Sequence, residues 1–217
     1  MDILIIRLKN CGFSKFTKKF LKRNKMGLTH EKIYDLHSWK ERKVTKTQED
    51  LYKEHDSPHL ILDLARLGGP AFGSLMEKIA KEYFNLKPRI DSSHDHIKFG
   101  LKIEQKSARY CANGKKGKWQ HIEMRHEWDV LIVSFLDFKE IKSYGASRKT
   151  IEYLIETGII SGQGKKKDGK GVPQQGYWFT EYDFSKKSKK FLDYFTEFKN
   201  ERAINRYFKN LNLMRST

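Results

Sequence analysis

The sequence predicts an α/β fold in which a central mixed β-sheet is flanked by helices. Residues 71–84 favour a helix, because apolar side chains recur there every three or four positions. Two strands are expected next, over 90–99 and 101–108, joined by a tight turn that contains Gly100. The continuous apolar run within 129–138 is typical of a strand covered on both faces. A helix, then two strands joined by a tight turn, then a strand covered on both faces indicate a layered α/β core.

Further elements are expected in the second half of the chain. A helix over 147–157 has Ser147 as its N-cap and Gly158 as its stop signal. An aromatic strand follows over 177–184, and an amphipathic C-terminal helix runs from about 189 to 208. Two Gly- and Lys-rich stretches are expected to be loops, residues 113–118 and 162–176. In the basic N-terminal region, short helices are predicted over residues 13–20 and 29–42.

The charge balance indicates a polyanionic partner. The 217-residue chain has 44 Lys and Arg against 27 Asp and Glu, a net charge of +17. So much positive charge opposes compaction, and nucleic acid is the polyanion that best rewards many Lys and Arg together. An anionic membrane is the rival partner, but no apolar run approaches the roughly 18–20 residues of a spanning helix. Cys11 and Cys111 make neither a disulfide framework nor a zinc cage. We therefore expect a soluble, cytoplasmic protein.

The segment over residues 91–107 carries the chemistry. Within its second strand, apolar residues alternate with charged ones, which places Glu104 and Lys106 on one face. A turn near Gly100 brings Asp95 or a neighbour alongside them. Two carboxylates and an ammonium group are therefore expected at one edge of the sheet.

Phosphodiester hydrolysis requires such a set of groups. Carboxylates of Asp95 and Glu104 suit Mg²⁺, a hard cation that also binds phosphate oxygens and lowers the pKa of water. The Lys106 ammonium can orient that water or stabilise developing charge. The backbone carbonyl of Gln105 offers a further oxygen ligand. The alternative is a plain solvated strand, because exposed edges often alternate Lys and Glu.

A resemblance to a known family follows from the same residues. The stretch from Asp95, DHIKFGLKIEQKS, resembles the D…(D/E)xK signature of the PD-(D/E)xK nuclease superfamily, to which many type II restriction endonucleases belong. The preceding residues 73–77 resemble a Gly-xxx-Glu that places an acid near the metal, and the strand over 129–138 lies where that fold expects one. The resemblance covers residues 73–138. It implies a restriction-endonuclease-like core, with Asp95, Glu104, Lys106 and Glu77 as catalytic residues and Asp95, Glu104 and Gln105 as the Mg²⁺ ligands.

The first acid of the motif has two candidates. The family pairs Pro with Asp, whereas Pro88 here lies three residues before Asp91 and seven before Asp95. We favour Asp95, because the register of the strand pair brings it beside Glu104; Asp91 stays the alternative.

Two other groups of this segment also have two interpretations. Glu77 is either an auxiliary acid or an ordinary helix-surface residue. His94 and His96 have the spacing of a transition-metal pair, but no third local ligand accompanies them, which favours surface or hydrogen-bonded histidines.

DNA-contacting side chains are predicted after the core. The start of the helix at Ser147 attracts phosphates, while Gln pairs with adenine and Lys or Arg with guanine. A flexible solvated loop explains the same composition, and 147–179 can also be read as a winged-helix unit. The candidates are Arg148, Lys149, Gln163, Lys165, Lys166, Lys167, Gln174 and Gln175.

We expect a single nuclease domain over residues 1–217, with double-stranded DNA as its partner and restriction-type cleavage as its function. Its parts are a basic helical N-terminal extension, a catalytic core, a DNA-contacting region and a C-terminal helix, over residues 1–60, 70–140, 145–184 and 185–217. A repair or junction-resolving nuclease of the same fold, or a non-catalytic winged-helix-like DNA-binding protein, is the alternative. A palindromic site has a two-fold axis, so a homodimer is expected.

Overall fold

The computed structural model describes residues 33, 36, 46–110, 116–162, 177–183 and 192–215. Its main sheet is mixed, since β3 and β5 run parallel and the other neighbours run antiparallel. The predicted α/β architecture, a mixed sheet flanked by helices, is confirmed. In spatial order the six strands are β1 (Lys87–Pro88), β2 (His96–Lys98), β3 (Leu101–Arg109), β5 (Val130–Leu136), β6 (Ile141–Ser147) and β9 (Thr196–Glu197).

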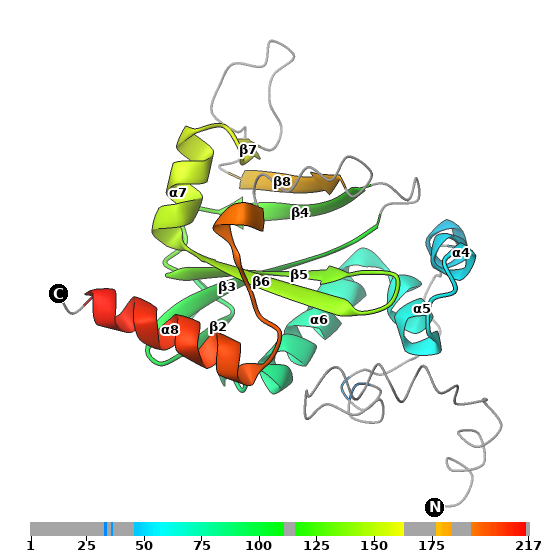
Figure 1. Ribbon diagram of the computed structural model, residues 1–217, viewed down its shortest axis with the longest axis horizontal. Helices are drawn as coiled ribbons and strands as arrows, with labels where there is room; N and C mark the ends of the chain where they lie inside the picture. The colour runs from blue at the N-terminus through cyan, green and yellow to red at the C-terminus, as the bar shows by residue number, and fades with distance from the viewer. Residues whose placement is uncertain are drawn as a thin grey trace, which may run out of the picture.

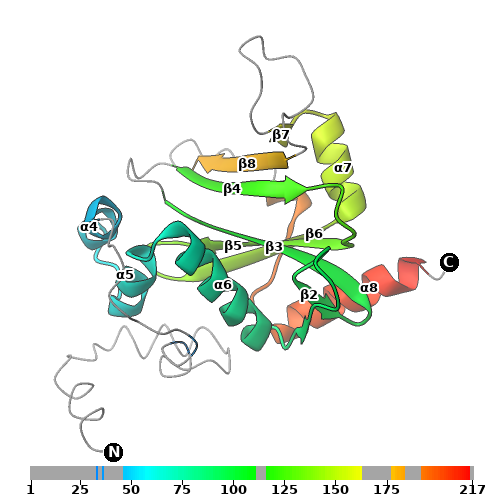
Figure 2. The ribbon, with the colours of Figure 1, turned by 180° about the vertical axis from the view of Figure 1, so that it is seen from behind.

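The main sheet lies between two layers (Figures 1 and 2). One face is covered by a second sheet in the order β4-β8-β7, with α7 beside it, and the other face by α6 and α8. The short helices α4 and α5 lie at one end. The bounds are β4 (Lys116–Glu123), β7 (Ser161–Gly162), β8 (Tyr177–Asp183), α4 (Lys46–Glu54), α5 (His59–Ala65), α6 (Gly69–Tyr83), α7 (Arg148–Glu156), α8 (Glu201–Arg215) and a 3-10 turn, η1 (Leu192–Tyr194).

Several predicted elements are confirmed, and so are the sequence features that predicted them. The helix α6 buries its apolar stripe, and every residue of β5 is buried, as expected for a strand covered on both faces. At the start of α7, the Ser147 hydroxyl accepts a hydrogen bond from the Thr150 amide at 3.2 Å. Within the described residues, no helix combines the length and apolar composition that a membrane-spanning segment needs.

Two predicted boundaries in the core are wrong. The strand expected over 90–99 is only His96–Lys98, because the preceding residues form turns in which the Asp91 carboxylate accepts the Ser93 amide at 2.7 Å. The loop expected over 113–118 ends earlier, since β4 begins at Lys116 and pairs with β8. Composition favoured a loop there, but strand pairing overrides it.

The C-terminal helix begins later than predicted, at Glu201. The segment before it is extended: β9 pairs with β6, and the Phe198 amide donates to the Ser143 carbonyl at 2.8 Å. Asn200 then caps the helix, because its side-chain oxygen accepts the Ala203 amide at 2.9 Å. The helices expected over 13–20 and 29–42 lie outside the described residues, apart from residues 33 and 36. Most of the loop expected over 162–176 lies outside them too.

Gly145 on β6 lets the C-terminal segment pack against the sheet. A Cβ atom at this position would lie 2.3 Å from the Phe198 ring. That ring is itself buried and packs against Phe84 at the C-cap of α6 and Tyr207 from α8, with ring centroids 5.9 and 5.3 Å away. Because neighbours hold the ring on several sides, it has little room to retreat.

We therefore predict that Gly145→Ala lowers the free energy of unfolding by about 1–3 kcal/mol, since an added methyl group overpacks the core. The matched control is Gly73→Ala in α6, where a Cβ meets nothing within 4 Å. That change should stabilise the protein by up to about 1 kcal/mol, because Ala favours a helix over Gly. Urea unfolding of both variants checks the pair, and equal midpoints would contradict the packing described.

Candidate active site

The turn between β2 and β3 fixes the register of the site. Phe99 and Gly100 have φ values of +51° and +81°, as a two-residue type I′ turn requires. Lys98 therefore pairs with Leu101, and the antiparallel register continues from there. Carried one residue beyond β2, this register puts Asp95 opposite Glu104.

Asp95 lies against the open edge of β3. Its amide donates to the Ile103 carbonyl at 2.8 Å, and its carboxylate accepts the Gln105 amide at 2.8 Å. The strand β2 pairs with β3 only up to Ile103. From that point on, the described part of the chain places no further strand of the main sheet along this side. The Asp95 carboxylate thus takes the place that a strand neighbour would fill.

The backbone carbonyl of Gln105 points to the same open edge. Lys102 exchanges hydrogen bonds with Asp129 on the other side of β3, so its backbone groups face β5. Successive residues of a strand direct their backbone groups to opposite sides. Gln105, whose amide binds Asp95, therefore presents its carbonyl beside that carboxylate.

Glu104 and Lys106 occupy one face of β3, as the alternation predicted. The Lys106 ammonium donates to the Glu104 carboxylate, which is 4% exposed. Burial raises the pKa of Glu104, and the negative charge of Asp95 adds to the rise, while Lys106 opposes it. Glu104 is thus a buried acid held by one cation and facing a second acid.

Glu77 joins this cluster from α6. Burial, followed by repulsion from Asp95, raises the pKa of Glu77 to about 7, and Lys106 and Arg89 act against that rise. The helix-surface interpretation of Glu77 does not describe this position. The negative charge of Asp95 raises the pKa of both Glu77 and Glu104, so positive charge is favourable in this cluster.

The donors fit a hard divalent cation. Mg²⁺ commonly takes one or two carboxylates and keeps several waters. Asp95, Glu104 and the Gln105 carbonyl meet at one edge and offer oxygen atoms alone. Among the described residues, no three His, Cys, Asp or Glu side chains already converge as a ready cage. In this structure, the cation that Glu104 binds is the Lys106 ammonium.

The opposite face of β3 joins the site to α6. The Gln105 side-chain amide donates to the Met76 carbonyl at 3.1 Å, and its oxygen lies 3.1 Å from Nε2 of His96. Met76 precedes Glu77, so this bond fixes the helical turn that carries the third acid. Burial lowers the pKa of His96, which favours its neutral form.

The remaining acid and histidine of the motif lie apart from the carboxylate cluster. Asp91 is exposed and lies 3.9 Å from the Lys102 ammonium. Hydrogen bonds from Ser93 lower the pKa of Asp91 to about 2. His94 is buried, with Nδ1 3.2 Å from Asp91. The structure thus places Asp95 opposite Glu104, and the two histidines are buried and hydrogen-bonded.

Two residues near the site were not predicted from the sequence. Arg89 lies close enough to lower the pKa of Glu77, and its position directly after Pro88 was the only available signal. His126 lies close enough to lower the pKa of Glu104, and its Nε2 atom is 3.3 Å from the Glu123 carboxylate. Nothing in the sequence marked His126, because its position depends on how the chain folds back after β4.

Arg148, predicted to contact DNA, makes structural hydrogen bonds in the fold. Its guanidinium donates to the carbonyls of Met124, His126 and Trp128 and to the Glu152 carboxylate, and it stacks over the buried Trp128 ring. Lys149 is exposed at the start of α7. The other predicted DNA contacts lie outside the described residues, namely Gln163, Lys165, Lys166, Lys167, Gln174 and Gln175.

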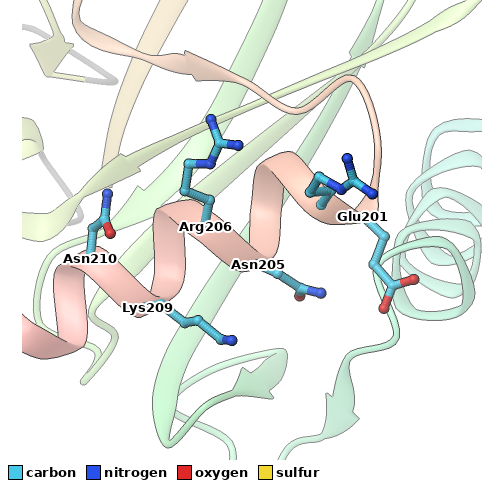
Figure 3. A pocket seen from close by; sticks show the side chains of 6 residues that line it. Glu201, Asn205, Arg206, Lys209 and Asn210 are labelled. Carbon is cyan, nitrogen blue, oxygen red and sulfur yellow. The ribbon is translucent and has the colours of Figure 1, made fainter.

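Two surface hollows of about 500 Å³ each lie near the C-terminal helix. One is on α8 itself, where Figure 3 shows Arg206, Lys209 and the neighbouring polar side chains around it. It contains none of the carboxylates of Asp95, Glu104 and Glu77. The other extends from Lys102 on β3 to Arg215 at the end of α8.

Comparisons with protein-family models, with curated proteins and with solved structures gave no match.

We predict that Glu77 makes the metal-free protein less stable as pH rises. A raised pKa means that the folded state binds more protons than the unfolded state between pH 4.5 and about 7. The free energy of unfolding therefore falls through that window. Glu77→Gln removes this loss, so in EDTA its advantage over wild type should be roughly 1–2 kcal/mol larger at pH 8 than at pH 5.

The control for this measurement is Glu82→Gln on the same helix, where the glutamate is exposed. Urea unfolding at both pH values provides the comparison. If both variants show the same pH dependence, Glu77 is not in the crowded position described.

Proposed function

We propose that this chain is a Mg²⁺-dependent endonuclease that hydrolyses phosphodiester bonds of double-stranded DNA. It would have a restriction-endonuclease-like core of the PD-(D/E)xK type and act as a type II restriction enzyme. The observation that carries the proposal is the placement of Asp95 opposite Glu104 at an open strand edge, with Lys106 bound to Glu104. The net charge of +17 supports a DNA substrate.

In this proposal, Asp95, Glu104 and the Gln105 carbonyl would hold the Mg²⁺. The ion supplies Lewis acidity, which neutralises charge on the phosphate and lowers the pKa of water. Lys106 then leaves Glu104 and donates to the attacking water or to a phosphate oxygen as charge develops. Water would attack phosphorus and lose a proton to Glu77 or to solvent, while the bond to the leaving sugar oxygen breaks and that oxygen takes a proton from solvent.

Glu77 has an auxiliary role in this scheme. With a pKa of about 7, its carboxyl group exchanges a proton readily near neutral pH. It can accept a proton from water on the α6 side of the carboxylates. Gln105 positions Glu77 through its bond to the Met76 carbonyl.

A restriction-type role further implies two chains on one duplex. Each chain carries one set of Asp95, Glu104 and Lys106, so one chain supplies one strand-cutting centre. A palindromic site matches the two-fold axis of a homodimer. Light scattering of the Glu104→Gln protein on a short cognate duplex should therefore give two chains per duplex. One chain per duplex would favour a monomer that nicks the strands in turn.

The carboxylate and lysine variants test the proposed chemistry. Asp95→Asn and Glu104→Gln should abolish Mg²⁺-dependent nicking of supercoiled plasmid, because each removes a ligand charge. Lys106→Met should slow nicking by roughly 10²–10³-fold, the usual cost of losing one transition-state donor. Asp91→Asn is the matched control and should keep wild-type activity. Loss in Asp91→Asn with full activity in Asp95→Asn would show that Asp91 is the first acid.

A second readout on these proteins is independent of activity. Mg²⁺ should raise the thermal midpoint of wild type at pH 8, because a ligand that binds only the folded state stabilises it. The rise should disappear in Asp95→Asn and Glu104→Gln and persist in Asp91→Asn. An equal rise in all four proteins would place the cation elsewhere.

A further inference from the structure

The hollow next to the carboxylates has more cations than acids in its lining. It lies between the start of β3, the turn after β4, the start of α7 and the end of α8. Four side chains in its wall are permanently positive, against two carboxylates, Glu127 and Asp129. The positive groups are Lys102, Arg125, Arg148 and Arg215, with His126 beside them.

This hollow adjoins the proposed active site. Lys102 is two residues from Glu104 on the same face of β3, a separation of about 7 Å along a strand. His126 belongs to the lining of the hollow and is also close enough to lower the pKa of Glu104. A DNA strand whose scissile phosphate lies at Glu104 would therefore bring a neighbouring phosphate over Lys102.

The two acids in the wall differ in what they do. Asp129 is committed to the fold, because its carboxylate accepts the Lys102 amide at 2.8 Å and pairs with Arg215 at 2.7 Å. Glu127 is 80% exposed and pairs with the Lys102 ammonium at 2.9 Å. Exposed ion pairs are weak and screened, so a phosphate can replace Glu127 at little cost.

The arginines differ in the same way. Arg148 is held by backbone carbonyls and supports the floor of the hollow. Arg125 and Arg215 have side chains that are 67% and 59% exposed at its rim, paired with Glu123 and Asp129 respectively. Exposed arginine side chains at the rim of a hollow are suited to phosphate oxygens.

We propose that this hollow is a binding site for a DNA backbone phosphate next to the scissile one, formed by Lys102, Arg125 and Arg215. The proposal rests on the nuclease function above and adds a residue set that positions the strand. Phosphate contacts fix register without reading sequence, so this site sets where the duplex lies over the carboxylates. Glu127 competes with the phosphate for Lys102.

Salt dependence of DNA binding tests the site directly. Binding of wild type and variants to a random-sequence duplex is measured in EDTA across a range of salt concentrations. Each phosphate contact contributes about 0.9 to the slope of log affinity against log salt, so Arg125→Gln and Arg215→Gln should each reduce the slope by about one. Glu127→Gln should tighten binding instead, a direction that misfolding does not produce.

The matched control is Arg66→Gln, which removes the same charge at the C-cap of α5. Figure 1 shows α5 at the end of the molecule opposite to the C-terminus of α8. Arg66 pairs with Asp63 at 3.0 Å, much as Arg215 pairs with Asp129. Its slope should equal that of wild type. Equal changes in the salt slope for Arg66→Gln and Arg215→Gln, or weaker DNA binding by Glu127→Gln, would overturn the proposed phosphate site.

Plasmid nicking separates failure of this site from failure of the nuclease proposal. If wild type nicks with Mg²⁺, the site predicts a raised KM with nearly unchanged kcat for Arg125→Gln and Arg215→Gln. Wild-type kinetics in both variants would reject the site and leave the nuclease standing. A wild type that binds DNA with the predicted slopes but never nicks would reject the nuclease and leave the phosphate site.

Discussion

The pairing of Lys98 with Leu101 across a two-residue turn determines the geometry of the whole site. Because side chains alternate along a strand, a register shift of one residue would turn Glu104 and Lys106 toward α6. It would also remove the Asp95 carboxylate from the Gln105 amide, to which it now bonds at 2.8 Å. The short length of β2 matters equally, since a longer strand would cover the edge where the Gln105 carbonyl points.

The second constraint is the crowding of negative charge. Glu104 is almost fully buried, and Glu77 has its pKa raised to about 7 by burial and by Asp95. Such an arrangement costs stability unless a cation offsets it, and Lys106 supplies only one positive charge. The crowded carboxylates lower the stability of the metal-free fold at this position. Such a local loss of stability is common at sites that bind a cation. The surrounding fold supplies the compensation, through a buried β5 and the packing of Phe198 on Gly145.

The sequence was sufficient for features that depend on local pattern. Alternation along β3 predicted the shared face of Glu104 and Lys106, and the Ser147 cap predicted the start of α7. Features set by tertiary contact were predicted less well. The three-residue spacing of Phe195 and Phe198 is typical of one face of a helix, but the pairing of β9 with β6 makes this segment extended, and both rings are buried. Arg148 resembled a DNA contact because it begins a helix, but nearby carbonyls bind its guanidinium.

Sequencing of DNA ends after incubation of a long duplex with the full chain and Mg²⁺ tests whether the chain cuts DNA as a restriction-type enzyme. We expect new ends at discrete positions, cut in both strands, and none when Glu104→Gln replaces wild type. Scattered ends, or cutting confined to branched substrates, would favour a repair-type nuclease. DNA that stays intact with folded wild-type protein over a range of Mg²⁺ concentrations would contradict the proposed nuclease activity.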